Sequence, residues 1–224
     1  MIANGQEAQV TLIIFDCDGV LVDSEPITNR AISENLRGHG LDVTPEWCME
    51  NFVGGTIAGV GQQARALGAD LPEDWVARMY EEVFDVLARG TPEIPGAGAA
   101  VSALQDAGFA TCVASNGPRR KMDITLTSVG MFGRFAGRIY SAHEVGIPKP
   151  APGLFLHAAR VHETAPSACI VIEDSPSGAR AARSAGMRCL ARRSELPEAR
   201  LEAEGAVLFD RMSDLPDLIK EMVR

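Results

Sequence analysis

Short apolar runs rich in β-branched residues recur along the chain. The first covers residues 10–15 (VTLIIF), and similar runs follow at residues 110–114, 139–140, 169–172 and 188–191. Runs that are apolar throughout are typical of strands buried on both faces of a parallel sheet. The stretches between the later runs are long enough for helices, so the pattern predicts an α/β fold with a parallel sheet.

The strand pattern stops between residues 24 and 91. Helix-like patches occupy this segment and are broken at residues 38–40, 54–55 and 68–72. We therefore predict an α/β core that is split in sequence, residues 1–23 and 92–224, with residues 24–91 as a small all-helical insert. Because ligands of open α/β sheets bind at the carboxyl ends of the strands, an insert after the first strand is placed to cover a site.

The charge balance limits the partners of the chain. A net charge of −9 and a pI near 5.0 disfavour binding to nucleic acid or to a membrane surface through a basic patch. A small anionic substrate would then need local positive charge. Lysine is scarce for this purpose, because Lys121, Lys149 and Lys220 stand against eighteen arginines.

Cysteine usage and hydropathy predict the compartment. The five cysteines are odd in number and widely spaced, which indicates reduced, buried thiols and no zinc site. Residues 1–9 are short and polar, and no apolar run approaches the roughly 18 residues that a membrane span needs. We expect a soluble cytoplasmic protein, by default a monomer.

Two acidic residues stand where the first strand is predicted to end. Asp16 and Asp18 are separated by one residue, and the chain turns at Gly19. Clustered carboxylates repel each other unless a cation or a shared proton intervenes. The pair therefore suits a hard divalent cation or coupled nucleophile and acid/base roles. A turn with two solvated acids is the alternative.

Polar groups also follow the later strands. They are Ser115-Asn116-Gly117, Lys149 between two prolines, and Glu173-Asp174. Phosphoryl transfer needs an in-line nucleophile, donors and cations for the phosphoryl oxygens, and a metal that bridges protein and phosphate. Each of these parts has a candidate here, so the convergence favours phosphoryl transfer.

Each group also has a structural interpretation. Ser115 or Asn116 could cap the helix that follows, although a helix start can bind an anion at the same time. Lys149 could be a surface-loop lysine, and Glu173 and Asp174 could be acids favoured by a helix dipole.

These motifs resemble those of the haloacid dehalogenase superfamily of phosphatases and phosphomutases, in particular the small-helical-cap subgroup that includes β-phosphoglucomutase-like proteins. Residues 16–25 are similar to the first motif, Ser115-Asn116-Gly117 to the second, Lys149 to the third, and residues 173–178 to the fourth. Their order and spacing agree along the whole chain. The resemblance implies a Rossmann-like core with an inserted helical cap.

The resemblance also implies a reaction. Asp16 would attack phosphorus to form an aspartyl-phosphate, and Asp18 would protonate the leaving alcohol and later activate water. Mg²⁺ would be held by Asp16, the backbone carbonyl of Asp18, and Asp174, with Glu173 assisting. The phosphate-binding residues would be Ser115 and Lys149, with Asn116 in a supporting role.

Departures within the superfamily narrow the chemistry. Dehalogenases of this fold lack the second aspartate, whereas Asp18 is present here. Phosphonoacetaldehyde hydrolases use a cap lysine, and residues 24–91 contain none. Mutases present cap lysine and arginine to a second phosphate, but the matching segment, residues 52–56, has apolar or small neighbours. Hydrolysis is therefore favoured over a mutase reaction.

We expect a Mg²⁺-dependent phosphatase acting on a small phosphorylated metabolite, such as a sugar or sugar-acid phosphate. The alternatives are a β-phosphoglucomutase-like mutase and a phosphate-ester binding protein without turnover. Candidate specificity residues are Val53, Gly54, Gly55 and Arg119, and Arg65 could also supply a charge distant from the reacting phosphate.

Overall fold

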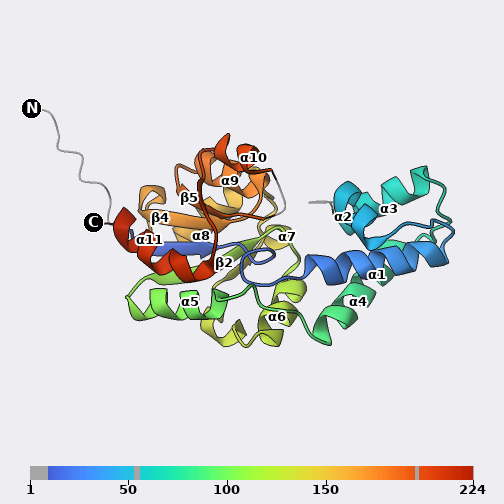
Figure 1. Cartoon of the computed structure of the whole chain (residues 1–224), viewed down its shortest axis with the longest axis horizontal. Coiled ribbons are helices and arrows are strands. Elements are labelled where there is room, and N and C mark those ends of the chain that lie inside the picture. The colour runs from blue at the N-terminus through green and yellow to red at the C-terminus, as the bar shows by residue number, and fades with distance from the viewer. Residues whose placement is uncertain (1–9, 53–55, 195–196, 224) are drawn as a thin grey trace, which may run out of the picture. The chain divides into compact units, whose positions relative to one another are not determined.

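The computed structural model of the chain describes residues 10–52, 56–194 and 197–223 (Figure 1). The chain divides into two compact units, one made of Met1–Val22 with Glu93–Arg224 and the other of Asp23–Pro92. Val22 and Glu93 form an antiparallel β-bridge, and the Asp23 N–H donates to the Pro92 carbonyl at 2.9 Å. The outgoing and returning segments of the chain are therefore paired with each other.

The first unit contains a parallel sheet, which in the described residues has six strands in the order β3-β2-β1-β4-β5-β6. The strands are β1 (Leu12–Phe15), β2 (Ala110–Ser115), β3 (Ile139–Ser141), β4 (Cys169–Glu173), β5 (Arg188–Arg192) and β6 (Val207–Phe209). Every paired strand runs parallel to its neighbour, with Phe15 opposite Val113 on one side and Ile172 on the other. The predicted α/β class with a parallel sheet is confirmed.

β6 is a strand that the apolar pattern did not predict. It has three residues and lies at the sheet edge beside β5. Val207 is exposed and Leu208 is half-buried, so this strand lacks the fully buried character of the central strands. The run Val-Leu-Phe before Asp210 is the sequence signal that could have found it.

Alternating side chains of β1 enter two separate apolar clusters. Ile13 and Phe15 face one cluster, and Leu12 and Ile14 face the other. The Phe15 ring meets the ring of Phe135 edge to face, with centroids 6.2 Å apart. The sheet is therefore buried on both faces, as the continuous apolar runs require.

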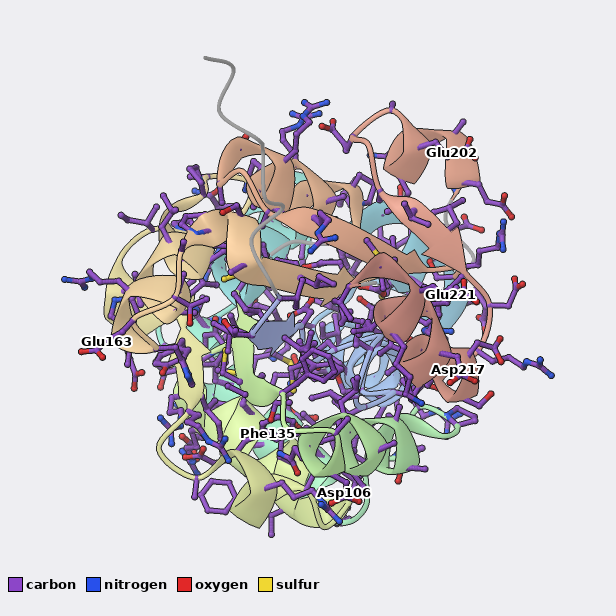
Figure 2. The ribbon with its side chains drawn as sticks, turned by 90° about the vertical axis from the view of Figure 1, so that its left-hand side faces the viewer. Asp106, Phe135, Glu163, Glu202, Asp217 and Glu221 are labelled. Carbon is purple, nitrogen blue, oxygen red and sulfur yellow. The ribbon has the colours of Figure 1, made fainter. Side chains whose placement is uncertain are left out.

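Helices cover both faces of this sheet. The first cluster includes residues of α5 (Ala97–Asp106), α6 (Arg119–Ser128) and α11 (Leu215–Met222), and the second includes residues of α8 (Gly153–Val161) and α9 (Pro176–Ser184). Asp106, Asp217 and Glu221 point outward from α5 and α11 in Figure 2. The shorter elements are α7 (Ala142–Val145), α10 (Glu198–Glu202), η1 (Phe132–Phe135), η2 (Pro166–Ala168) and η3 (Met212–Asp214).

The second unit is helical in all its described elements. They are α1 (Glu25–Gly38), α2 (Pro45–Phe52), α3 (Ile57–Ala66) and α4 (Trp75–Ala88). Trp75 is buried, and its Nε1–H donates to Asn35 Oδ1 at 2.7 Å. A Cβ at Gly61 would lie 3.0 Å from the Trp75 ring, so this glycine lets α3 approach α4. The unit thus has a core of its own.

In the part of the chain that the structure describes, no helix is both long and apolar enough to cross a membrane. The five cysteines all fall in the described ranges, and each is buried and outside any disulfide. This agrees with the thiol state expected from their spacing.

Candidate active site

Neighbouring strands bring acidic and hydroxyl side chains to the carboxyl edge of the sheet. Asp16 directly follows β1, Ser115 ends β2 and Glu173 ends β4. Because β1 lies between β2 and β4 and all three are parallel, these strand ends meet. The Asp16 N–H donates to the Ile172 carbonyl at 2.9 Å, which fixes its backbone beside β4.

Lys149 joins two of the acidic residues. Its Nζ lies 3.0 Å from Asp16 Oδ1 and 2.6 Å from Glu173 Oε1. The lysine side chain is 2% exposed, so it is a buried cation and not a surface-loop lysine. The Phe155 ring, with its centroid 5.0 Å from Nζ, covers the ammonium group further.

Asn116 holds the backbone of this lysine. Its Oδ1 accepts from the Lys149 N–H at 2.8 Å, and its Nδ2 donates to the Lys149 carbonyl at 3.1 Å. Both ends of the amide are therefore engaged by the lysine main chain. Asn116 therefore fixes the backbone of Lys149, which is compatible with the supporting role expected for it beside the phosphate-binding residues.

Glu173 is fixed by several donors. In addition to Lys149, its Oε2 accepts from the N–H groups of Asp174 and Ser175 at 3.0 Å each and from Ser175 Oγ at 2.8 Å. The carboxylate lies against Gly178, where a Cβ would be 1.8 Å from Glu173 Oε1. Only a glycine leaves room for this acid.

Asp174 occupies a similar cradle at Gly19. Gly19 has φ +74°, and a Cβ there would lie 1.9 Å from Asp174 Oδ2. Both the backbone conformation and the close approach therefore require glycine. Arg192, the last residue of β5, donates from Nε to the Gly19 carbonyl at 2.7 Å. Arg192 was not expected at the site, although its position at a strand end was a usable signal.

Asp16, Glu173 and Asp174 can direct ligand atoms to one point. One carboxylate oxygen from each lies within 4.8 Å of the others. Carboxylate oxygens are the ligands that hard divalent cations such as Mg²⁺ prefer. The donor set therefore fits a magnesium ion.

The electrostatics of these acids also fit a cation. Burial raises the pKa of Asp16 to about 7 and outweighs the opposing charge of Lys149. Burial acts on Glu173 too, but Lys149 and the hydrogen bonds from Ser175 hold its pKa below the ordinary value. A divalent ion beside Asp16 would favour its ionised form.

The second aspartate of the pair has its own partner. Asp18 Oδ2 lies 2.9 Å from the Nζ of Lys121, which sequence reasoning did not assign to the site. The signal available was the scarcity of lysine in this chain. Ser115 Oγ accepts from the Gly117 N–H at 3.2 Å, so the hydroxyl lies at the turn between β2 and α6.

Three specificity candidates lie outside the described residues, namely Val53, Gly54 and Gly55. Arg119 is engaged away from the acidic groups, because its Nε bonds to Asp123 Oδ1 at 2.7 Å and its Nη1 to the Ile139 carbonyl at 3.1 Å. Arg65, in the helical unit, donates to the carbonyls of Leu71 and Pro72. Each of the two arginines is thus engaged by groups of its own unit.

The glycine cradle leads to a stability prediction. Gly178→Ala is expected to lower the free energy of unfolding by about 1–3 kcal/mol, because its Cβ would displace the buried Glu173 carboxylate. Urea denaturation measures the change. Gly133→Ala is the matched control, since its Cβ would meet nothing within 4 Å. Equal stability of the two variants would contradict the requirement for glycine beside the Glu173 carboxylate.

Comparison with known proteins identifies the family. A family model described as haloacid dehalogenase-like hydrolase matches residues 10–186. The 6-phosphogluconate phosphatase of Escherichia coli (strain K12) is 29% identical over 215 residues, which cover 95% of this chain and 96% of that protein. The chloroplastic protein SUPPRESSOR OF QUENCHING 1 of Arabidopsis thaliana is 34% identical over 213 residues, which cover 91% of this chain but 20% of that protein.

A solved structure agrees with these relatives. The haloacid dehalogenase family hydrolase from Deinococcus radiodurans R1, crystallised with bound phosphate and sodium, has a TM-score of 0.80 and 27% sequence identity. The match covers 96% of this chain and 98% of that chain. The family expected from the motifs is confirmed: the chain belongs to the haloacid dehalogenase-like hydrolases.

Proposed function

We propose that this hydrolase is a Mg²⁺-dependent phosphatase that cleaves small phosphate monoesters through an aspartyl-phosphate on Asp16. The observation that carries the proposal is the buried Lys149, which lies 3.0 Å from Asp16 and next to a group of three acids able to hold a metal. A nucleophilic carboxylate, a cation for phosphoryl oxygens and a metal site are the parts that phosphoryl transfer needs.

The first step forms the bond between Asp16 and phosphorus. The Lys149 ammonium and the Cys17 N–H both hold Asp16 Oδ1, at 3.0 and 2.8 Å, so the carboxylate has one orientation for attack. As the phosphorus–ester oxygen bond breaks, Asp18 gives a proton to the leaving oxygen. Ser115 and Lys149 offer donors to the phosphoryl oxygens.

The second step returns the enzyme to its starting state. Water attacks the phosphorus of the aspartyl-phosphate and gives a proton to Asp18, and the bond from phosphorus to Asp16 breaks. Inorganic phosphate is the product. The proton balance closes, because Asp18 regains in this step the proton that it gave in the first.

Asp16, Glu173 and Asp174 would hold the magnesium ion, together with the backbone carbonyl of Asp18. When bound, Mg²⁺ would offset the negative charge of the phosphoryl group. Gly19 leaves space for the Asp174 carboxylate, and Gly178 leaves space for the Glu173 carboxylate. Both glycines thus accommodate the proposed metal ligands.

The metal assignment has a readout that does not need activity. Mg²⁺ at about 100 times its Kd should stabilise the wild-type protein by about 2.7 kcal/mol, which raises the melting temperature by several degrees. Asp174→Asn should lose most of this shift, whereas the exposed control Asp217→Asn should keep it. EDTA should reverse the shift. An undiminished shift in Asp174→Asn would count against the site.

We propose sugar and sugar-acid phosphates as the substrates, supported by the 6-phosphogluconate phosphatase relative. The helical unit, Asp23–Pro92, would select among leaving groups. Phosphate release over a panel of sugar, sugar-acid and nucleotide monophosphates tests this assignment, and activity confined to nucleotides would refute it. A parallel incubation with a hexose 1-phosphate and a bisphosphate activator tests the mutase alternative, which isomerisation without phosphate release would establish.

A further inference from the structure

Two of the three lysines in the sequence pair with the two aspartates of the first motif. Lys149 contacts Asp16, as described, and Lys121 contacts Asp18 with 2.9 Å between Nζ and Oδ2. The third, Lys220, lies on α11 and forms an exposed pair with Asp217 at 3.1 Å. Lysine is rare in this chain, which has eighteen arginines. The pairing of a second lysine with an aspartate of the first motif therefore draws attention to Lys121.

Lys121 reaches Asp18 from the first turn of α6. Its side chain is 17% exposed and that of Asp18 is 20% exposed, so the pair is largely shielded from water. A Cβ at Gly117 would lie 3.7 Å from Lys121 Cδ, 3.7 Å from Ser115 Oγ and 3.8 Å from Asp18 Oδ2. The lysine, the aspartate and the serine therefore converge around Gly117.

This placement is poor for stability alone. A cation in the first turn of a helix opposes the helix dipole, which favours acids there. A largely buried ion pair also loses hydration that its attraction only partly replaces. Residues whose placement costs stability are often found at functional positions. The placement of Lys121 therefore points to a function.

The helix start is anchored independently of this pair. Met122, next to Lys121, is buried in the apolar cluster that contains Ile13 and Phe15. Thr125 Oγ1 donates to the Lys121 carbonyl at 3.1 Å. The backbone of Lys121 is thus fixed to the core. The ion pair from its side chain can therefore restrain the Asp18 carboxylate. In the proposed reaction Asp18 transfers a proton first to the leaving oxygen and then from a water. A single defined orientation of its carboxylate favours both transfers.

We propose that Lys121 is a positioning residue that holds the Asp18 carboxylate in the orientation used in both steps of the reaction. The inference rests on the proposed function, because it assumes that Asp18 transfers the proton. It adds to the site a cation whose partner is the acid/base and not the phosphoryl group.

The test compares Lys121→Met, Lys121→Arg and the matched control Lys220→Met with 2,4-dinitrophenyl phosphate. This leaving group departs without a proton, so the first step does not need Asp18, but hydrolysis of the aspartyl-phosphate does. Rapid mixing resolves the burst of dinitrophenolate from the steady state. Circular dichroism and melting temperature check that each variant is folded.

If Lys121 acts through Asp18, Lys121→Met keeps a burst close to that of wild type while its steady-state kcat falls about ten- to hundredfold. KM falls with kcat, so kcat/KM stays close to that of wild type, because only the second step is slowed. The loss in kcat is part of the 10²–10⁴ that general acid–base catalysis contributes. Lys121→Arg should recover part of kcat, Asp18→Asn should show the same pattern more strongly, and Lys220→Met should match wild type.

Several outcomes would overturn the inference. A slowed burst or a raised KM in folded Lys121→Met would mean that the lysine contacts the substrate. An unchanged kcat would mean that the pair has no role, and an equal loss in Lys220→Met would point to a general charge effect. Asp16→Asn in the same assay should give no burst. A wild-type burst from that variant would refute the proposed function, independently of the result for Lys121.

Discussion

Asp16→Asn is expected to lower kcat for p-nitrophenyl phosphate by at least about 10⁴-fold, because an amide oxygen is not a nucleophile for phosphorus. The substitution keeps the size and shape of the side chain next to Lys149, so the fold should persist. Asp217→Asn makes the same chemical change on an exposed acid and should leave kcat unchanged. Wild-type-like turnover by Asp16→Asn would remove the nucleophile from the mechanism.

The same variant should be more stable than wild type in EDTA at pH 8. The pKa of Asp16 in the folded protein is raised from 3.8 to about 7, so the folded state binds this proton more tightly than the unfolded state. The contribution of Asp16 to wild-type stability is therefore lost as the pH rises from about 4 to about 7. Asparagine does not ionise, and its advantage in melting temperature should shrink as the pH is lowered toward about 4.

Lys149→Met is the second substitution with a large expected effect. It should lower the free energy of unfolding by about 3–5 kcal/mol at pH 8, because it leaves Asp16 and Glu173 buried without their shared cation. It should also lower kcat by about 10³-fold, as expected for loss of a donor to phosphoryl oxygens. Urea denaturation and phosphate release measure the two effects.

Controls separate charge from packing in this variant. Lys220→Met removes an exposed lysine and should change stability by less than about 0.5 kcal/mol. Adding Glu173→Gln to Lys149→Met should restore part of the lost stability, because it removes one of the two unpaired charges. If Lys149→Met unfolds no more readily than wild type, the buried ion pairs do not have the importance given to them here.

The sequence was sufficient to predict the strands that carry the chemistry. Runs such as residues 10–15 are apolar throughout because the sheet is covered on both faces, and this pattern is visible without a structure. The acids follow at strand ends, and parallel strands bring those ends together. The juxtaposition of Asp16, Glu173 and Asp174 could therefore be predicted from order alone.

The contacts of long or amide side chains could not be predicted in the same way. The amide of Asn116 binds the Lys149 backbone 33 residues along the chain, a contact that local sequence does not indicate. Arg192 reaches the Gly19 carbonyl across 173 residues. These hydrogen bonds depend on which strands are neighbours and on how far a side chain extends. Neither can be deduced from the spacing of residues along the chain. β6 was missed because an edge strand lacks the double burial that marks the central strands.

The pairing of Val22 with Glu93, and of the Asp23 N–H with the Pro92 carbonyl, has an evolutionary consequence. The ends of the inserted segment are held together by the backbone, so the closure of the loop does not depend on what lies between them. Lengthening such an insert costs little, since the closure penalty grows only with the logarithm of its length. The described charged groups of the site all come from the other unit. Duplicated genes could therefore exchange or remodel the insert, and so acquire new substrates, while inheriting the reaction unchanged.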